Sequence, residues 1–375
     1  MFSVALKIIL YDKVRSLITL SGVVFAVSLI FAQIGIYLGL METASTIIDH
    51  TPGDIWITSK NSRNFDFSQP FPEHKINQVL AAEGVKGAEK LIVTWAVIKQ
   101  EEGGTEQIEI VGYNPDTGIG GPWQMKEGHF SDVKTGNYII IDESSVRRVG
   151  EFKIGDYREI MKRRLKIVGI SKGVKSFTTA PIVFMSYKLA QDVGGLIGHD
   201  NTVFIIANVL EGFSPKKVVR MMKDNLYDID AFTKEDFSRK TRLYWTIETG
   251  VGFSFLITIV ISFFVGMLIV GQTIYNSTME YLKEFGTLKA IGATNFNIYQ
   301  IIFSEALITA SVGYLVGLII TLLSIKIYVI NDMVFTITIR VALSVFIVSL
   351  IMCFSAAFFS VRKIRNIDPA MVFRS

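Results

Sequence analysis

Four long apolar runs stand out along the chain, and most polar positions lie between the first run and the second. The runs cover residues 17–41, 246–275, 299–330 and 335–361. About 20 apolar residues span the hydrocarbon core of a bilayer, so each run is long enough to cross it. The first run is longer than the apolar region of a signal peptide and no A-x-A cleavage pattern follows it, so we expect it to be retained. The pattern predicts an α-helical membrane protein with four transmembrane helices.

Basic residues in the short flanking segments predict the orientation of these helices. They gather before the first span, between spans two and three, and after span four: Lys7, Lys13, Arg15, Lys283, Lys289, Arg362, Lys363, Arg365 and Arg374. We therefore expect both termini, the loop 276–297 and the tail 362–375 in the cytoplasm, with residues 42–245 outside it. Residues 1–16 fit either an interfacial helix on the cytoplasmic side or an extension of span one.

The region between spans one and two has the pattern of an α+β domain. Alternating apolar residues bounded by turns predict strands at 53–59, 91–100, 107–113, 137–142, 165–170, 181–186, 201–210 and 228–232. Helices are expected at 73–82, 143–149 and 215–226, the last with Ser214 as its cap. The two ends of the domain thus read β-α-β, and a β-rich lobe of about residues 114–199 is inserted between them.

Composition and motifs exclude several classes of protein and kinds of site. Hydrophobic residues make up 50 % of the chain and the mean hydropathy is +0.41, values that do not fit a soluble protein. The net charge of +4, without an aromatic and basic stripe, gives no reason to expect nucleic-acid binding. The single cysteine, Cys353, lies in an apolar run, and the four histidines lack ligand spacing. No P-loop, G-x-S-x-G or H-E-x-x-H pattern occurs. We therefore expect no catalytic, cofactor or metal site, and any ATP and Mg to be bound by a partner subunit.

The loop 276–297 is too polar for a membrane span and too regular for a simple connection. Apolar residues recur at every third position and charged residues mark the other side: Met279, Leu282, Phe285, Leu288 and Ile291, with Glu280, Lys283, Glu284 and Lys289. Gly292 fits a left-handed helix end, and Thr294 or Asn295 can cap the next helix. A short amphipathic helix of this kind either docks into a groove on a partner or lies against lipid headgroups.

Small and acidic residues within the spans point to helix packing. Gly35 and Gly39 in span one, and Gly313 and Gly317 in span three, have the spacing that permits close approach of helices. The pair in span one fits either a seam between two copies or packing within one subunit. Glu305 is the only acidic residue deep in an apolar run, where a charge is costly. Its place about two turns from the edge of the run favours a structural pair or contact with water over a transport role.

Residues 280–294, EYLKEFGTLKAIGAT, resemble the signature that follows span two in MacB/FtsX-type ABC transporter permeases. That signature runs roughly E-R-x-x-E-I-G-x-L-K-A-I-G-A. The residues that match it are Glu280, Glu284, Gly286, Leu288, Lys289, Ala290, Gly292 and Ala293. Tyr281 and Phe285 stand where arginine and isoleucine are frequent, without interrupting the apolar stripe. One span before and three after a large outer domain also match, so the resemblance covers the whole chain.

Other segments resemble the DevC subgroup of this family. They are ILYDKVR at 9–15, the first span at 21–40, IIDHTPGDIWITSKNSRNFDFSQPFP at 47–72 and IDPAMVFRS at 367–375. DevC-like permeases work with a periplasmic adaptor (membrane fusion) protein and a TolC-like outer-membrane channel. The resemblance therefore implies an exporter of the bacterial inner membrane that moves its cargo from the periplasm or the outer leaflet.

The family resemblance also implies a mechanism. Two copies would form a homodimer in membrane lipid and bind two ATP-binding subunits. Residues 280–293 would form the coupling helix on that subunit, with contacts from Glu280, Leu282, Glu284, Phe285, Gly286, Leu288, Lys289 and Gly292. Phe285→Asp or Leu288→Asp would then abolish the association. ATP-driven closure would move the outer domain through stalk extensions of spans one and two, a mechanism called mechanotransmission.

Other functions stay open beside the exporter. An FtsX-like permease would instead relay the ATPase cycle to cell-wall hydrolases, and a lipoprotein-releasing permease would receive lipoprotein on its outer domain. A membrane receptor would need a cytoplasmic signalling domain. The large outer domain with its inserted lobe favours the exporter, whose cargo is open among glycolipid, polysaccharide, peptide and drug.

Overall fold

The computed structural model describes residues 2–100, 103–176, 180–195, 197–330 and 334–364. The chain forms two compact units, and each is described by itself. Residues 1–39 and 251–375 form one of them, which we call the membrane unit. Residues 40–250 form the other, which we call the α+β domain.

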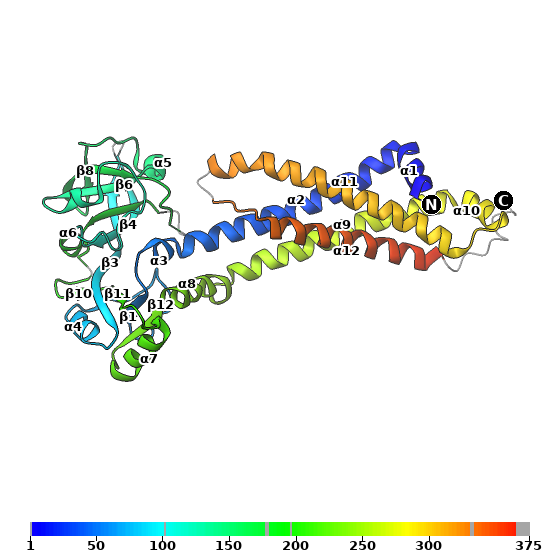
Figure 1. Cartoon of the computed structure of the whole chain (residues 1–375). Helices are drawn as coiled ribbons and strands as arrows, with labels where there is room; N and C mark the ends of the chain where they lie inside the picture. Colours follow the sequence, from blue (N-terminus) through cyan, green and yellow to red (C-terminus); the bar gives the residue numbers. More distant parts are fainter. Residues whose placement is uncertain (1, 101–102, 177–179, 196, 331–333, 365–375) are drawn as a thin grey trace. The chain divides into compact units, whose positions relative to one another are not determined.

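The membrane unit is a bundle of long helices preceded by a short one (Figure 1). Within the described residues, four helices are long and apolar enough to cross a membrane: α2 (Lys13–Ala44), α9 (Val251–Glu280), α11 (Asn295–Ile330) and α12 (Ile339–Ile364). Helix α1 (Phe2–Tyr11) packs against α11. The carboxylate of Asp12 accepts a hydrogen bond from the Arg15 N–H at 3.1 Å and so caps α2. The N-terminal helix is therefore separate from span one and not an extension of it.

Spans two and four begin later than the apolar pattern predicts. Residues Tyr244–Glu248 form a π-helical turn, and Gly250 has a φ of +75°, so α9 starts only at Val251. Before α12, residues 334–338 run without helical structure. The Thr336 N–H donates to the Gly35 carbonyl at 3.2 Å, and a Cβ at Gly39 would lie 1.8 Å from the Val334 carbonyl oxygen. Residues 334–338 are mostly apolar, so the hydropathy pattern includes them in span four, although their backbone is not helical and packs against α2.

Glycines bring helices α2 and α11 into direct contact. A Cβ at Gly313 would lie 2.4 Å from Val23 Cγ1, and one at Gly317 would lie 2.8 Å from Val27 Cγ1. The Ser28 hydroxyl donates to the Gly317 carbonyl at 3.3 Å on the same face. The predicted small-residue spacing in span three thus lies against the valines of span one within a single chain. Gly35 and Gly39 face the segment before α12 in the same way.

The α+β domain is built on two β-α-β units that share one sheet (Figure 1). The first is β1 (Ile55–Ser59), α4 (Lys75–Leu80) and β3 (Val85–Lys99), and the second is β11 (Phe204–Val209), α7 (Pro215–Asn225) and β12 (Ile229–Thr233). Their strands lie in the order β12-β1-β11-β3, and all neighbours are antiparallel. Ile55, Ile57 and Ile205 form a buried cluster with Val218 and Met222 of α7. The predicted α+β domain between spans one and two is confirmed.

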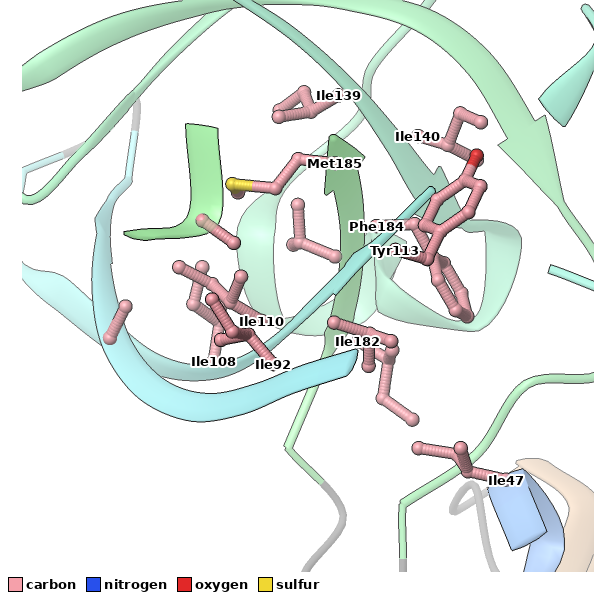
Figure 2. Close-up of a cluster of buried hydrophobic side chains, with 14 of the residues drawn as sticks. Ile47, Ile92, Ile108, Ile110, Tyr113, Ile139, Ile140, Ile182, Phe184 and Met185 are labelled. Atoms are coloured by element: carbon pink, nitrogen blue, oxygen red, sulfur yellow. The ribbon is translucent and has the colours of Figure 1, made fainter. Parts of the chain in front are cut away.

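The inserted lobe continues the same sheet through β3. The second half of β3 pairs with β4 (Thr105–Tyr113), and β9 (Ile182–Ser186) pairs in parallel with β4. Strands β6 (Tyr138–Asp142) and β8 (Arg163–Ser171) follow. Figure 2 shows the buried core of this lobe, where Ile92, Ile110 and Tyr113 meet Phe184 and Met185. The lobe therefore begins with β3 and β4 and not at residue 114.

Several short elements differ from the sequence expectations. The predicted strand 201–210 divides at Val203 into β10 (Asn201–Thr202) and β11, and β10 pairs with β2 (Phe71–Pro72). The predicted helix 143–149 is a 3-10 turn (Glu143–Ser145) followed by α5 (Val146–Val149). Besides β2 and the π-helical turn, the pattern missed α3 (Thr46–His50), β5 (Met125–Glu127), η1 (Phe130–Val133), β7 (Tyr157–Ile160), α6 (Tyr187–Val193) and α8 (Lys234–Leu243). All are short, and most are too polar to show a clear period.

Polar contacts join the segments through which the chain enters and leaves the α+β domain. The Arg242 guanidinium donates to Asp49 at 2.5 Å and to the Ser45 hydroxyl at 2.7 Å, which ties α8 to α3. The Trp245 indole N–H donates to the Asp66 carboxylate at 2.8 Å. A charge-assisted bond between partly buried groups is among the stronger polar interactions in proteins. These contacts fix the base of the domain at its two connections.

Two carboxyl groups are buried beside this base. Glu109 of β4 is only 2 % exposed, and Glu109, Asp66 and Ser176 line the same small cavity. Burial raises the pKa of Glu109 to about 8, the nearby charge of Asp66 adds to the shift, and a hydrogen bond with Ser176 opposes it. Burial likewise raises the pKa of Asp66 to about 6, against the effect of the Trp245 hydrogen bond.

The glycine contact between α2 and α11 predicts an asymmetric response to alanine. At Gly313 the new methyl group would overlap Val23, whereas at Gly271 of α9 the nearest atom, Ala356 Cβ, is 3.7 Å away. We expect Gly313→Ala to lower the free energy of unfolding by roughly 1–3 kcal/mol because the interface is overpacked. The matched Gly271→Ala should be neutral or stabilising, since alanine favours helix. Thermal unfolding of both variants in detergent measures the difference, and equal stabilities would contradict the contact.

The buried carboxyls predict that stability falls as the pH rises. A carboxyl with a raised pKa keeps its proton in the fold after the unfolded chain has released it, so stability is lost between about pH 4.5 and pH 8. Glu109→Gln should flatten the dependence of stability on pH. At pH 8 it should raise the melting temperature and increase the free energy of unfolding by an amount on the order of a few kcal/mol. Glu127→Gln on the exposed strand β5 is the control and should keep the wild-type slope. Parallel slopes for the two variants would show that Glu109 is not the responsible group.

Candidate functional site

The loop between spans two and three contains a short, well-defined helix. Helix α10 (Leu282–Ala290) follows α9 after a turn at Tyr281, so it is shorter than the predicted 280–293. Gly292 has a φ of +105°, its N–H donates to the Lys289 carbonyl, and the Ala293 N–H donates to the Leu288 carbonyl. This pair of bonds is the Schellman motif. The Thr294 hydroxyl then accepts from the Asn297 N–H at 3.4 Å and caps α11. The predicted roles of Gly292 and Thr294 in ending and starting these helices are confirmed.

The apolar stripe of α10 divides between the membrane unit and solvent. Phe285 is 6 % exposed and belongs to the buried cluster of the membrane unit that includes Ile298 and Ile301 of α11. Leu288 is half-buried against the same cluster. Phe285 is therefore used to attach α10 to its own bundle. The expectation that Phe285→Asp would act directly on a partner contact does not fit this position, because a charge there would first disturb the membrane unit.

The opposite side of the loop is open. Ile291 is 80 % exposed and Phe296 is 65 % exposed. Lys283, Glu284 and Thr287 are exposed on α10 as well. Among the other predicted contact residues, Gly292 is exposed, and Leu282, Gly286 and Lys289 are half-buried. Two large apolar side chains beside charged residues form an exposed patch of the kind that partner proteins cover.

An ion pair joins this loop to the start of span one. The Arg15 guanidinium pairs with Glu280 and also with Asp12, at 2.5 Å for the latter. The same guanidinium lies over the Tyr281 ring, 5.7 Å from its centroid. Sequence reasoning placed Glu280 on the partner-facing side, and its side chain is 66 % exposed even in this pair. Sequence reasoning missed the pairing of Glu280 with Arg15 because the two residues are far apart in the chain and no local pattern links them.

The α+β domain offers no comparable chemistry among its described residues. One of its cavities, of about 550 Å³, is lined by Glu73, His74, Ile76, Asn77, Lys90 and Asp200. The Glu73 carboxylate accepts bonds from Lys90 at 2.9 Å, the Tyr187 hydroxyl at 3.0 Å and the Gln191 amide at 3.1 Å. A carboxylate with three donors is structurally satisfied. Within the part of the chain that the structure describes, no three His, Cys, Asp or Glu residues gather as metal ligands.

Two protein-family models match successive parts of the chain. The MacB-like periplasmic core domain matches residues 16–224, which is more than half of the chain. The FtsX-like permease C-terminal domain matches residues 256–369, a region that includes α10.

Similar proteins have been found in bacteria and archaea. The chain is 25 % identical over 382 residues to an uncharacterized ABC transporter permease of Mycobacterium tuberculosis, covering 100 % of this chain and 99 % of the relative. It is 24 % identical over 344 residues to an uncharacterized ABC transporter permease of Methanocaldococcus jannaschii, covering 85 % and 82 %.

Solved structures of isolated domains are also similar to part of the chain. The periplasmic region of MacB from Actinobacillus actinomycetemcomitans aligns with a TM-score of 0.40 and 12 % identity, covering 51 % of this chain and 94 % of that one. The extracellular domain of the ABC-type transporter YknZ from Gram-positive bacteria aligns with a TM-score of 0.35 and 13 % identity, covering 48 % and 98 %.

The family models account for both units of the structure. One covers the first span with most of the α+β domain, and the other covers the later spans with the loop that contains α10. The resemblance of residues 280–294 to the permease signature is thereby confirmed. The chain belongs to the MacB/FtsX-type family of ABC transporter permeases.

Proposed function

We propose that this permease transmits the ATP cycle of a partner subunit to its α+β domain and so drives export by mechanotransmission. An ABC permease works with an ATP-binding subunit, and we assign α10 and the start of α11 as the surface on which that subunit docks. ATP and Mg are then bound by the partner. The exposed patch around Ile291 and Phe296 is the observation that supports this assignment most directly.

The attachment of α10 supports transmission of movement. A docked subunit can move the spans only if the loop that it holds is fixed to them. Phe285 is buried in the cluster of the membrane unit, and Glu280 pairs with Arg15 at the start of α2. Displacement of α10 would therefore act on the beginning of span one and the end of span two together. The basic residues that flank these helices support our proposal that this loop lies in the cytoplasm, as the positive-inside rule predicts.

On the other side of the membrane we propose a DevC-like assembly. In it a homodimer in the inner membrane contacts a periplasmic adaptor protein and delivers cargo to a TolC-like channel. The resemblance of residues 9–15 and 47–72 to DevC permeases supports this proposal. So does the inserted lobe, which adds exposed surface beyond the shared β-α-β core. The hydrogen bonds of Arg242 to Asp49 and of Trp245 to Asp66 attach the connecting segments to the domain. Such attachment is needed if movement of the spans is to move the domain.

The docking surface predicts different outcomes for the exposed and the buried side of the loop that contains α10. Ile291→Gln removes an exposed apolar side chain, and we expect it to weaken binding of the ATP-binding subunit about tenfold, or about 1.4 kcal/mol. Its melting temperature should stay at the wild-type value, since the side chain is 80 % exposed. Phe285→Asp should lower the melting temperature because it buries a charge. Co-purification in mild detergent and thermal unfolding measure the two effects. Unchanged co-purification of the Ile291 variant would contradict the assigned surface.

Partner capture tests the export function. Photo-crosslinking from the lobe of the full-length chain in its native membrane should capture an adaptor protein, with a crosslinker at exposed Glu127. A matched crosslinker at Tyr227, which is 77 % exposed in the core β-α-β part, should capture less of it. Capture of a cell-wall hydrolase or a lipoprotein in place of the adaptor would overturn the exporter in favour of a regulator or a lipoprotein-releasing permease.

A further inference from the structure

A cavity of about 250 Å³ lies in the membrane unit where α1 turns into α2. Its walls come from α1, α2, α9 and α11, and it lies at the same end of the bundle as the Arg15–Glu280 ion pair. The proposed docking of an ATP-binding subunit uses a different surface, because neither Ile291 nor Phe296 lines this cavity.

Most of the cavity wall is apolar, and part of it is open on the outer face of the spans. Ile8, Leu20 and Ile308 line it together with Leu17 and Val312. Leu17 is 67 % exposed and Val312 is 41 % exposed in the single chain. Apolar side chains exposed on membrane-spanning helices face the hydrocarbon of the lipid or another apolar surface. The cavity is thus accessible to a molecule with one apolar end.

The polar part of the cavity holds both signs of charge. Glu305 of α11 faces Asp12, Lys13 and Arg15 from the junction of α1 and α2. Among the residues that the structure describes, the Glu305 carboxyl has no hydrogen bond or ion pair, although it lies in an apolar helix where a charge is costly. A hydrogen-bond donor that is also a cation would satisfy it best.

The basic side of the cavity has unused donors. The Arg15 Nη1 atom is buried without an acceptor, although the rest of this guanidinium pairs with Asp12 and Glu280. Lys13 is exposed and pairs with no acid in the described part of the chain. An anionic oxygen at this place would accept from both side chains. The cavity therefore lacks an acceptor beside α2 and a cationic donor beside α11.

We propose that this cavity binds the headgroup of an aminophospholipid of the phosphatidylethanolamine type. Its phosphate accepts from Lys13 and Arg15, and its primary ammonium donates to Glu305. A volume of 250 Å³ holds a headgroup and not a whole phospholipid, so the acyl chains extend over Leu17 and Val312. Phosphatidylcholine lacks an N–H for Glu305, and phosphatidylglycerol lacks a cation. The lipid braces α1 against α11 beside the Arg15–Glu280 ion pair.

Native mass spectrometry of the purified full-length chain tests this site. The chain is titrated separately with dioleoyl-phosphatidylethanolamine, -phosphatidylcholine and -phosphatidylglycerol. We expect one bound phosphatidylethanolamine per chain at a concentration at least tenfold lower than for the other two lipids. Glu305→Gln should lower the affinity for phosphatidylethanolamine to the affinity for phosphatidylcholine. Lys13→Gln should weaken the binding of phosphatidylethanolamine severalfold and leave a smaller preference for it over phosphatidylcholine.

Controls separate the site from general lipid adhesion. Lys326→Gln and Glu284→Gln remove the same charges outside the cavity and should leave the preference unchanged. Val312→Trp fills the cavity from its exposed edge and should abolish the preference without lowering the melting temperature of the delipidated chain. Equal binding of the three lipids, a preference for phosphatidylglycerol, or a phosphatidylethanolamine preference that survives Glu305→Gln would each overturn the proposal. Because the ATP-binding subunit is absent from the measurement, its outcome is independent of the proposed docking surface.

Discussion

Burial of Phe285 in the membrane unit is the interaction on which the proposed coupling depends. It fixes a short polar helix to an apolar bundle and leaves Ile291 exposed beyond the helix end. Fully burying a phenylalanine side chain is worth about 1.5–3 kcal/mol, which exceeds the contribution of an exposed ion pair. The Arg15–Glu280 pair therefore contributes less energy than Phe285, and in the proposed mechanism its role is to join the end of span two to the start of span one. Attachment uses the buried face of α10, whereas the proposed docking surface includes Ile291, which lies beyond the end of this nine-residue helix.

The membrane-spanning helices could be predicted from the sequence because a bilayer imposes a length and a composition on each of them. The strands of the β-α-β units were also predictable, since Ile55 to Ser59 are a short run of mostly apolar residues after the turn residues Pro52 and Gly53, and Ile229 to Thr233 alternate between buried and half-buried positions. The end of α10 followed from Gly292, where only local backbone geometry is needed. In each of these cases the determining residues are neighbours in the chain, so a local pattern contains the information.

What could not be predicted depends on contacts between distant residues. Phe335 and Thr336 are apolar or neutral enough for a span, yet the Phe335 ring and the Thr336 N–H both lie against Gly35 and no helix forms. The stripe on α10 predicted one apolar face, either for a partner or for lipid headgroups, but periodicity does not say which surface buries Phe285. The burial of Glu109 depends on the loop that contains Asp66 and on Ser176, which lie 43 and 67 positions away. Packing partners of this kind become visible only in the fold.

The central sheet also determines the order in which the α+β domain can fold during synthesis. Strand β1 has no neighbour nearby in sequence, because Ile55 pairs with Ala207 on one side and with Thr233 on the other. The lobe, in contrast, pairs β3 with β4 directly and can form a hairpin early. Contacts between distant segments form slowly because loop closure costs chain entropy. The first strand to emerge must therefore remain unpaired until β11 and β12 arrive, and its apolar edge needs protection from other chains throughout that interval.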